Sequence, residues 1–118
     1  MKKTLGILVA SIVAVVALAI PTLGAGAGQT VRVTERDGRI ALSARPRAGA
    51  VKFVVRNSGG ETHDFWIRGG GRRWKSSALA PGRTATVLAR LKKGIRYSYW
   101  CGISDHAEDG MRGSFVAR

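Results

Sequence analysis

The chain of 118 residues has little of several residue types on which protein chemistry usually depends. It contains one cysteine, two histidines and only seven acidic residues, against 20 basic ones. A single cysteine excludes a disulfide within the chain. The sequence also has no Ser-His-Asp set, no phosphate-binding loop and no carboxylate pair away from the segments that hold the histidines. No segment keeps a helical period of apolar residues, so we expect no long helix.

The first 27 residues have the pattern of an export signal. Lys2 and Lys3 precede an apolar run over residues 5–20, and Pro21 and the small residues 25–27 follow it as a cleavage motif. We therefore predict a signal peptide over 1–27 and a mature domain over 28–118. An uncleaved anchor stays open, because the run approaches the ~20 apolar residues that span a bilayer. Both interpretations place the domain outside the cytoplasm, in the periplasm, in the medium or on the outer face of the membrane.

From residue 28 onward, short runs of alternating apolar and polar residues are separated by turn residues. A tight hairpin is predicted at Asp37-Gly38. The Gly- and Arg-rich segment 69–75 is interpreted as a flexible, basic connection. Strands are predicted near 31–34, 40–42, 51–56, 63–68, 85–91, 96–101 and 113–117. About seven or eight short strands indicate an all-β fold, a Greek-key β-sandwich, with no second domain.

Four residues carry most of the chemical information. Cys101, His106 and Met111 stand in the spacing Cys-x4-His-x4-Met, and the other histidine, His63, lies upstream in Gly-Gly-Glu-Thr-His-Asp-Phe. One thiolate, two imidazoles and one thioether are the ligands of a type 1 copper site. Taken singly, each has an ordinary interpretation as a core or loop residue. As a set they favour copper, with zinc capture or a metal-free relic as the alternatives.

The chain resembles the cupredoxin family of plastocyanin-like small blue copper proteins over almost all of residues 28–118. The resemblance is densest in 94–101 (Gly-Ile-Arg-Tyr-Ser-Tyr-Trp-Cys) and in 110–113 (Gly-Met-Arg-Gly), and it includes Val-Val-Arg-Asn-Ser-Gly-Gly-Glu-Thr-His upstream. It implies one copper ion, with His63 as the more buried imidazole and Cys101 as the thiolate. It further implies that His106 is the imidazole near the surface and that Met111 is the axial sulfur.

The sequence departs from the family in both ligand loops. Many members have Pro-Gly where this chain has Ser104-Asp105, and many have Asn where it has Asp64. In the family that Asn ties the ligand loops together. Asp64 is expected to do the same by accepting a hydrogen bond from Ser104 or from a backbone N–H, or else to be a solvated loop acid.

The function that the resemblance implies is that of an exported mononuclear type 1 copper protein that shuttles single electrons and is not an enzyme. Two histidines are too few for the second copper centre of a nitrite reductase or a multicopper oxidase. The alternative is an extracytoplasmic protein that stores or delivers copper. A third hypothesis is a basic binding module on a degenerate cupredoxin fold.

The charge of the chain points to its partners. The net charge is +13, or +11 for residues 28–118, so we expect acidic redox proteins as partners, with an anionic membrane surface as an alternative. We expect no nucleic acid and a monomer. Trp100, at the position of a remote electron-exchange Tyr in plastocyanins, is either an electron route or an ordinary outward aromatic residue. The role of the basic run 68–75 stays open. Five of the seven acids lie in the two ligand loops, which predicts a polarised domain: Glu61, Asp64, Asp105, Glu108 and Asp109.

Overall fold

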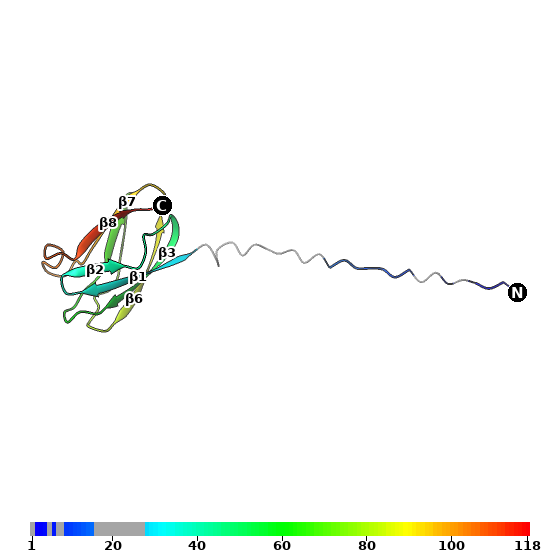
Figure 1. Cartoon of the computed structure of the whole chain (residues 1–118), viewed down its shortest axis with the longest axis horizontal. Helices are drawn as coiled ribbons and strands as arrows, with labels where there is room; N and C mark the ends of the chain where they lie inside the picture. Colours follow the sequence, from blue (N-terminus) through cyan, green and yellow to red (C-terminus); the bar gives the residue numbers. More distant parts are fainter. Residues whose placement is uncertain (1, 5, 7–8, 16–27) are drawn as a thin grey trace.

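A computed structural model of the chain describes residues 2–4, 6, 9–15 and 28–118 (Figure 1). Most of the predicted signal peptide, including the predicted cleavage motif at 25–27, lies outside the described residues. Within the described parts, no helix has the length and apolar character needed to cross a membrane.

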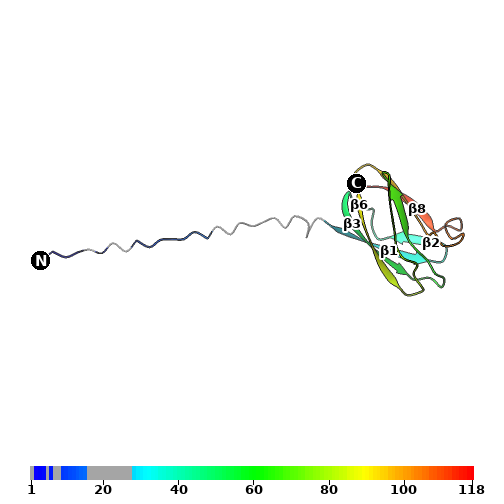
Figure 2. The same cartoon turned by 180° about the vertical axis from the view of Figure 1, so that it is seen from behind.

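Residues 28–118 fold into two four-stranded sheets that pack face to face (Figures 1 and 2). The first sheet has the strand order β2-β1-β3-β6 and the second has the order β5-β4-β7-β8. The strands are β1 (Gln29–Arg36), β2 (Arg39–Leu42), β3 (Gly49–Asn57), β4 (Trp66–Gly69), β5 (Arg72–Lys75), β6 (Thr84–Leu91), β7 (Arg96–Trp100) and β8 (Arg112–Val116). All pairs are antiparallel except β1 and β3. The predicted all-β sandwich of seven or eight strands is confirmed.

The core lies between the two sheets and follows from the period of two in the strands. Val31 and Val33 of β1 are buried while Arg32 between them is exposed, and β3 and β6 repeat the pattern. The second sheet contributes mainly aromatic side chains, among which Tyr97 and Phe115 stack at 5.7 Å between ring centroids. Burial of these faces against one another is the main driving force of the fold.

Segment 69–75 is not the flexible connection that its composition suggested. It forms the β4–β5 hairpin, in which Gly70 and Gly71 have positive φ angles of 57° and 76°. Two central residues with positive φ make the turn that joins twisted strands most easily. The side chains of β5 point alternately inward and outward: Trp74 packs against the core, and Lys75 lies over the ring of Trp66. Side-chain packing therefore overrides the turn-like composition of this segment.

The strand predicted at 63–68 begins later than expected. β4 starts at Trp66, and His63 makes only an isolated bridge with Leu79, through hydrogen bonds of 3.0 and 2.7 Å between their backbones. Because this stretch is not a regular strand, His63, Asp64 and Phe65 are all buried in succession. Three successive buried residues do not show the alternation expected of the strand predicted at 63–68. The irregular approach to β4 places His63 at the end of the sandwich beside the loop that follows β7.

Candidate metal centre

Three potential ligand atoms converge between the β3–β4 and β7–β8 loops. The Nδ1 atoms of His63 and His106 lie 3.2 Å apart, and the sulfur of Cys101 lies 3.8 and 3.7 Å from them. Within the described residues, His63, Cys101 and His106 form a cluster of potential metal ligands, whose donor atoms all lie within 4.8 Å of one another. The structure thus brings together three of the four predicted ligands, which come from positions 63, 101 and 106.

The triangle has the dimensions of a metal site. A point equidistant from the three atoms lies about 2.1 Å from each, and metal bonds to imidazole nitrogen and to thiolate sulfur are roughly 2.0–2.3 Å long. Two imidazoles and one thiolate in a trigonal arrangement, with a thioether available, form the donor set of a type 1 copper site. His63, Cys101 and His106 therefore fit the metal that the sequence predicted.

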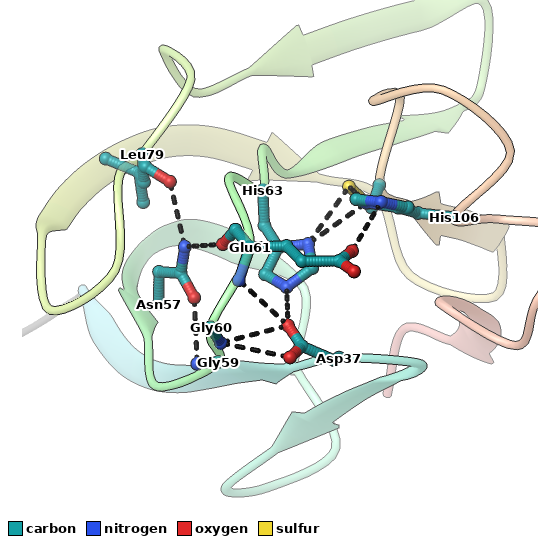
Figure 3. Close-up of polar contacts among 9 residues, drawn as sticks. Asp37, Asn57, Gly59, Gly60, Glu61, His63, Leu79 and His106 are labelled. Carbon is teal, nitrogen blue, oxygen red and sulfur yellow. Dashed lines mark hydrogen bonds and ion pairs between the residues drawn. The ribbon is translucent and has the colours of Figure 1, made fainter.

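Asp37 fixes the orientation of the His63 ring, as Figure 3 shows. The Asp37 carboxylate lies 2.8 Å from Nε2 of His63 and also accepts hydrogen bonds from the backbone N–H groups of Gly60 and Glu61. These contacts, that of Gly60 first and that of His63 next, lower the pKa of Asp37. A carboxylate only accepts, so Nε2 donates and the lone pair of Nδ1 points to the triangle.

Glu61 fixes the ring of His106 in the same way. Its carboxylate lies 2.8 Å from Nε2 of His106 (Figure 3), which leaves Nδ1 free for a metal. The side chain of His106 is 14 % exposed and that of His63 is 0 % exposed. Of the two imidazoles, His106 is the one nearer to solvent, as predicted.

Cys101 ends β7 with its sulfur fully buried. Burial raises the pKa of the Cys101 thiol; backbone N–H groups of Asp64 and Ile103 oppose this rise, while the charges of Asp64 and Glu35 add to it. A raised pKa keeps the metal-free side chain protonated. Metal binding therefore releases a proton from Cys101, because the thiolate is the ligand.

Met111 closes the second ligand loop. It is fully buried, its N–H donates to the carbonyl of His106 at 3.0 Å, and its carbonyl accepts from the N–H of Cys101 at 3.0 Å. The loop is thereby tied to both ligands that it carries. Met111 is well placed to supply the thioether, and its role as axial ligand stays a prediction.

The loop that carries His63 is held by Asn57 (Figure 3). The amide of this buried side chain donates to the carbonyls of Glu61 and Leu79 at 2.7 and 2.8 Å, and its oxygen accepts from the N–H of Gly59 at 2.9 Å. A Cβ at position 59 would collide with the Asp37 carboxylate, so the chain needs glycine there. These contacts explain why Asn and two glycines precede the histidine.

Asp64 links the two ligand loops, as expected from its position after His63. Of the two partners considered, the structure shows the backbone N–H: Gly102 donates to Oδ1 at 2.5 Å, and Nε1 of Trp66 donates to Oδ2 at 2.9 Å. Ser104 instead lies 3.2 Å from Asp105. Asp64 is therefore a connector of the site and not a solvated loop acid.

Glu35 is a buried acid whose charge acts on Cys101 and Asp64, and the sequence patterns did not point to it. It is fully buried, and neither of its carboxyl oxygens has a hydrogen-bond partner. Burial, with the charge of Asp64 second, raises the pKa of Glu35 to about 8. The available signal was its inward position in β1, two residues after Val33, where an apolar side chain is the rule.

All seven acidic residues of the chain gather at the end of the sandwich that holds the triangle. Asp37, Glu61 and Asp64 contact the ligand loops directly, and the charge of Glu35 acts on Cys101 and Asp64. The other three lie in the loop between Cys101 and Met111: Asp105, Glu108 and Asp109. The predicted polarisation extends further than expected, because Glu35 and Asp37 join the five acids noted in the sequence.

Comparison with solved structures places the fold among copper proteins. The chain superposes on auracyanin B with a TM-score of 0.65 and 18 % identity, over 76 % of this chain and 88 % of auracyanin B. It superposes on dithionite-reduced auracyanin from Roseiflexus castenholzii with a TM-score of 0.60 and 16 % identity, over 80 % and 99 % of the two chains. A Cu-containing nitrite reductase from Thermus scotoductus matches with a TM-score of 0.52 and 17 % identity, over 78 % of this chain but 28 % of the reductase. No protein-family model and no curated protein matches the sequence.

The fold and the site define a class together. The sandwich is cupredoxin-like, and it carries a type 1 copper-like site built from His63, Cys101 and His106 with Met111 beside them. At identities below 20 % the likeness to the auracyanins establishes the architecture. The chemistry rests on the residues of this chain.

Proposed function

We propose that this chain is an exported mononuclear type 1 copper protein that carries single electrons between redox proteins. The observation that carries the proposal is the convergence of two imidazole Nδ1 atoms and one buried cysteine sulfur on a common point. Bound there, copper supplies a one-electron couple between Cu(I) and Cu(II), which the mixed soft and borderline ligands accommodate.

The residues around the site support a carrier in preference to an enzyme. Asp37 and Glu61 hold the two rings, and backbone hydrogen bonds tie Met111 to Cys101 and His106. A site with three converging ligands and a buried thioether beside them leaves no open position for a substrate. The chain spans nearly the whole of each auracyanin but only 28 % of the nitrite reductase that shares its fold.

Export is supported by the first 27 residues, whose pattern is that of a signal peptide or an anchor. A free cysteine in an exported chain calls for a role other than disulfide formation, and metal ligation supplies one.

Copper storage or delivery is the second candidate function. The observation that favours it is the cluster of acidic side chains around the solvent-facing His106, since such a cluster attracts a metal cation. The two functions differ in the stability of the oxidised metal: a carrier holds both oxidation states reversibly, whereas a Cu(I) store does not form a stable Cu(II) site.

Copper titration with visible absorption tests both functions. Under anaerobic conditions, Cu(II) added to residues 28–118 is expected to give a blue thiolate charge-transfer band that saturates at one ion per chain and disappears and returns on reduction and oxidation. The Cys101→Ala variant is the control and is expected to show no band. Tight Cu(I) binding without colour would favour storage, and the absence of any binding would overturn both proposals.

The axial role of Met111 is tested by voltammetry of the copper protein. Met111→Leu is expected to raise the reduction potential and Met111→Gln to lower it, because the weak axial ligand tunes the couple. Unchanged potentials in both variants would show that Met111 is not the axial ligand.

A further inference from the structure

The outer face of the second sheet carries a row of four side chains in register across its four strands. Lys75 of β5 pairs with Trp66 of β4, Trp66 pairs with Trp100 of β7, and Trp100 pairs with Arg112 of β8. Arg68 and Arg73 follow in the next row. We call the outward side chains of Trp66, Arg68, Arg73, Lys75, Trp100 and Arg112 the tryptophan face.

The two indoles form a stacked pair that is covered by cations. Trp66 and Trp100 have centroids 5.9 Å apart and ring planes inclined by 14°. Arg73 and Lys75 lie 5.2 and 4.9 Å from the centroid of Trp66, and Arg68 lies 5.9 Å from that of Trp100. Cation–π contacts hold these long side chains in defined positions. The positive charges are thus ordered before any partner arrives.

The pair is coupled to the candidate metal centre on both sides of Cys101. Trp100 precedes Cys101 in the chain, and Trp66 packs against Gly102, where a Cβ would lie 2.5 Å from its Nε1. The same Nε1 donates to Asp64, which accepts from the N–H of Gly102. A contact on the tryptophan face therefore lies within one or two residues of the thiolate ligand.

The charge of this face is of one sign. No acidic residue occurs in β4, β5, β7 or β8, and both oxygens of the neighbouring Asp64 are engaged. With the acids gathered around the ligand loops, the tryptophan face is a separate, positive surface of the same domain. Complementarity requires a partner that presents carboxylates or phosphates.

The details of the face favour a protein with surface carboxylates over nucleic acid and over a membrane. The cations occupy positions over the indole rings, whereas single-stranded nucleic acid needs those rings open for base stacking. Membrane insertion needs exposed apolar side chains, and within residues 28–118 the large exposed one is Leu88, on the other sheet. Arg guanidinium groups bind carboxylates and phosphates alike through two parallel hydrogen bonds, so the choice rests on the covered rings and on the position of Leu88.

We propose that the tryptophan face is the docking surface for an acidic redox protein, whose carboxylates pair with Arg68, Lys75 and Arg112. The proposal rests on the proposed electron-carrier function, for which it names the class of partner and the surface that meets it. Docking here places the partner beside Trp100 and Cys101, away from the acidic side chains near His106.

Binding is tested with poly-L-glutamate as the probe and tryptophan fluorescence as the signal, on copper-free and copper-loaded protein at low salt. The triple variant Arg68→Gln, Lys75→Gln, Arg112→Gln removes three charges from the face. The control variant Lys52→Gln, Arg56→Gln, Arg90→Gln removes three exposed charges from the outer face of the first sheet. We expect about tenfold weaker binding in the face variant, because three exposed ion pairs are lost together. The affinity of the control variant for poly-L-glutamate should change by less than about threefold.

Electron exchange is tested with hexacyanoferrate(III), an anionic oxidant that accepts one electron from the reduced copper protein and becomes hexacyanoferrate(II). The face variant is expected to slow this reaction at low salt more than the control variant of equal net charge does. An equal decrease in the two variants would leave net charge as the cause and overturn the proposal. Near-UV circular dichroism of each variant checks that the fold is intact.

Two further probes decide between the possible occupants. The probes are single-stranded poly(dT) and vesicles of phosphatidylglycerol and phosphatidylcholine, each compared with poly-L-glutamate at equal charge. Tighter binding of either probe would overturn the assignment to an acidic protein. The copper titration separates the two proposals. Face-specific binding without a blue centre would refute the carrier function alone, whereas a blue centre without face-specific binding would refute the docking surface alone.

Discussion

The two sheets divide the work of building the site. The segments that lead into or out of the second sheet supply the donor atoms of His63, Cys101 and His106. The β1–β2 turn of the first sheet supplies Asp37, which holds the ring of His63, and Glu61, from the same loop as His63, holds the ring of His106. The outer face of the second sheet carries aromatic and basic side chains. The inward side chains of the first sheet are largely aliphatic. Ligand identity and ligand orientation are thus encoded in different parts of the chain.

The difference shows that the site depends on contacts between segments that are distant in the sequence. His63 and Asp37 are 26 residues apart and meet only when the β1–β2 turn lies against the β3–β4 loop. Substitutions in the first sheet should therefore alter metal affinity and stability without removing a ligand. Three predictions probe this division, in order of decreasing effect.

The largest effect is expected from Glu35→Gln. The pKa of Glu35 is about 8 in the folded protein and near 4.5 in the unfolded chain, so folding takes up a proton between these values. The stability that this proton provides is fully present below pH 4.5 and is lost as pH rises through 8. We expect Glu35→Gln to remove this slope and to stabilise the metal-free protein above pH 8 by at most about 5 kcal/mol, because each pH unit between the two pKa values corresponds to about 1.4 kcal/mol.

Urea unfolding of the wild-type and variant proteins from pH 5 to pH 9 measures the effect. Glu108→Gln, which changes an exposed loop acid, is the control and should keep the wild-type slope. Parallel pH profiles for the wild type and Glu35→Gln would show that Glu35 is ionised in the folded protein.

An intermediate effect is expected from Asp37→Ala. Loss of the carboxylate frees the ring of His63 and releases the N–H groups of Gly60 and Glu61, so copper affinity should fall about 10–100-fold. Competition with a Cu(I) chelator measures the change. Asp105→Ala removes the same charge from the other ligand loop without touching a ligand ring, and a similar loss of affinity in that variant would mean that charge alone is responsible.

The smallest effect is expected from Glu61→Gln. Its carboxylate is 60 % exposed, so solvent screens the contact with His106, and the loss in copper affinity should be at most about fivefold. The loss should also shrink as salt is added. A larger effect than that of Asp37→Ala would reverse the order of the two acids and show that His106 is the more dependent ring.

Much of the fold and of the candidate ligand set could be predicted, because both depend on residue patterns within short segments of the sequence. Alternation of apolar residues revealed the strands, and the spacing of Cys101, His106 and Met111 revealed the ligands. The β4–β5 hairpin was missed because its composition is that of a loop, and only the packing of Trp74 and Lys75 makes it a strand. The strand predicted at 63–68 begins too early, because His63 bonds to the backbone of Leu79 in place of regular strand pairing.

The supporting contacts could not be predicted because they join residues far apart in the chain. Nothing near Asp37 in the sequence indicates that it meets His63, and nothing near Trp66 indicates that Trp100 lies beside it. Such pairs depend on the register and order of the strands. Glu35 is the exception, since its inward position in β1 was visible and the burial of a charged residue there was the clue.

The gathering of all seven acids at one end also governs how a metal cation travels to the site. At low ionic strength, where the Debye length exceeds the ~10 Å that it has at 0.1 M, a distant cation experiences the net positive charge of the domain and is repelled. Close to His106 it meets Glu61 and the acids of the second loop, and the force becomes attractive. A cation therefore meets an electrostatic barrier far from the domain and an attractive region close to His106. Added salt screens the long-range repulsion first, so it should speed the uptake of copper ions.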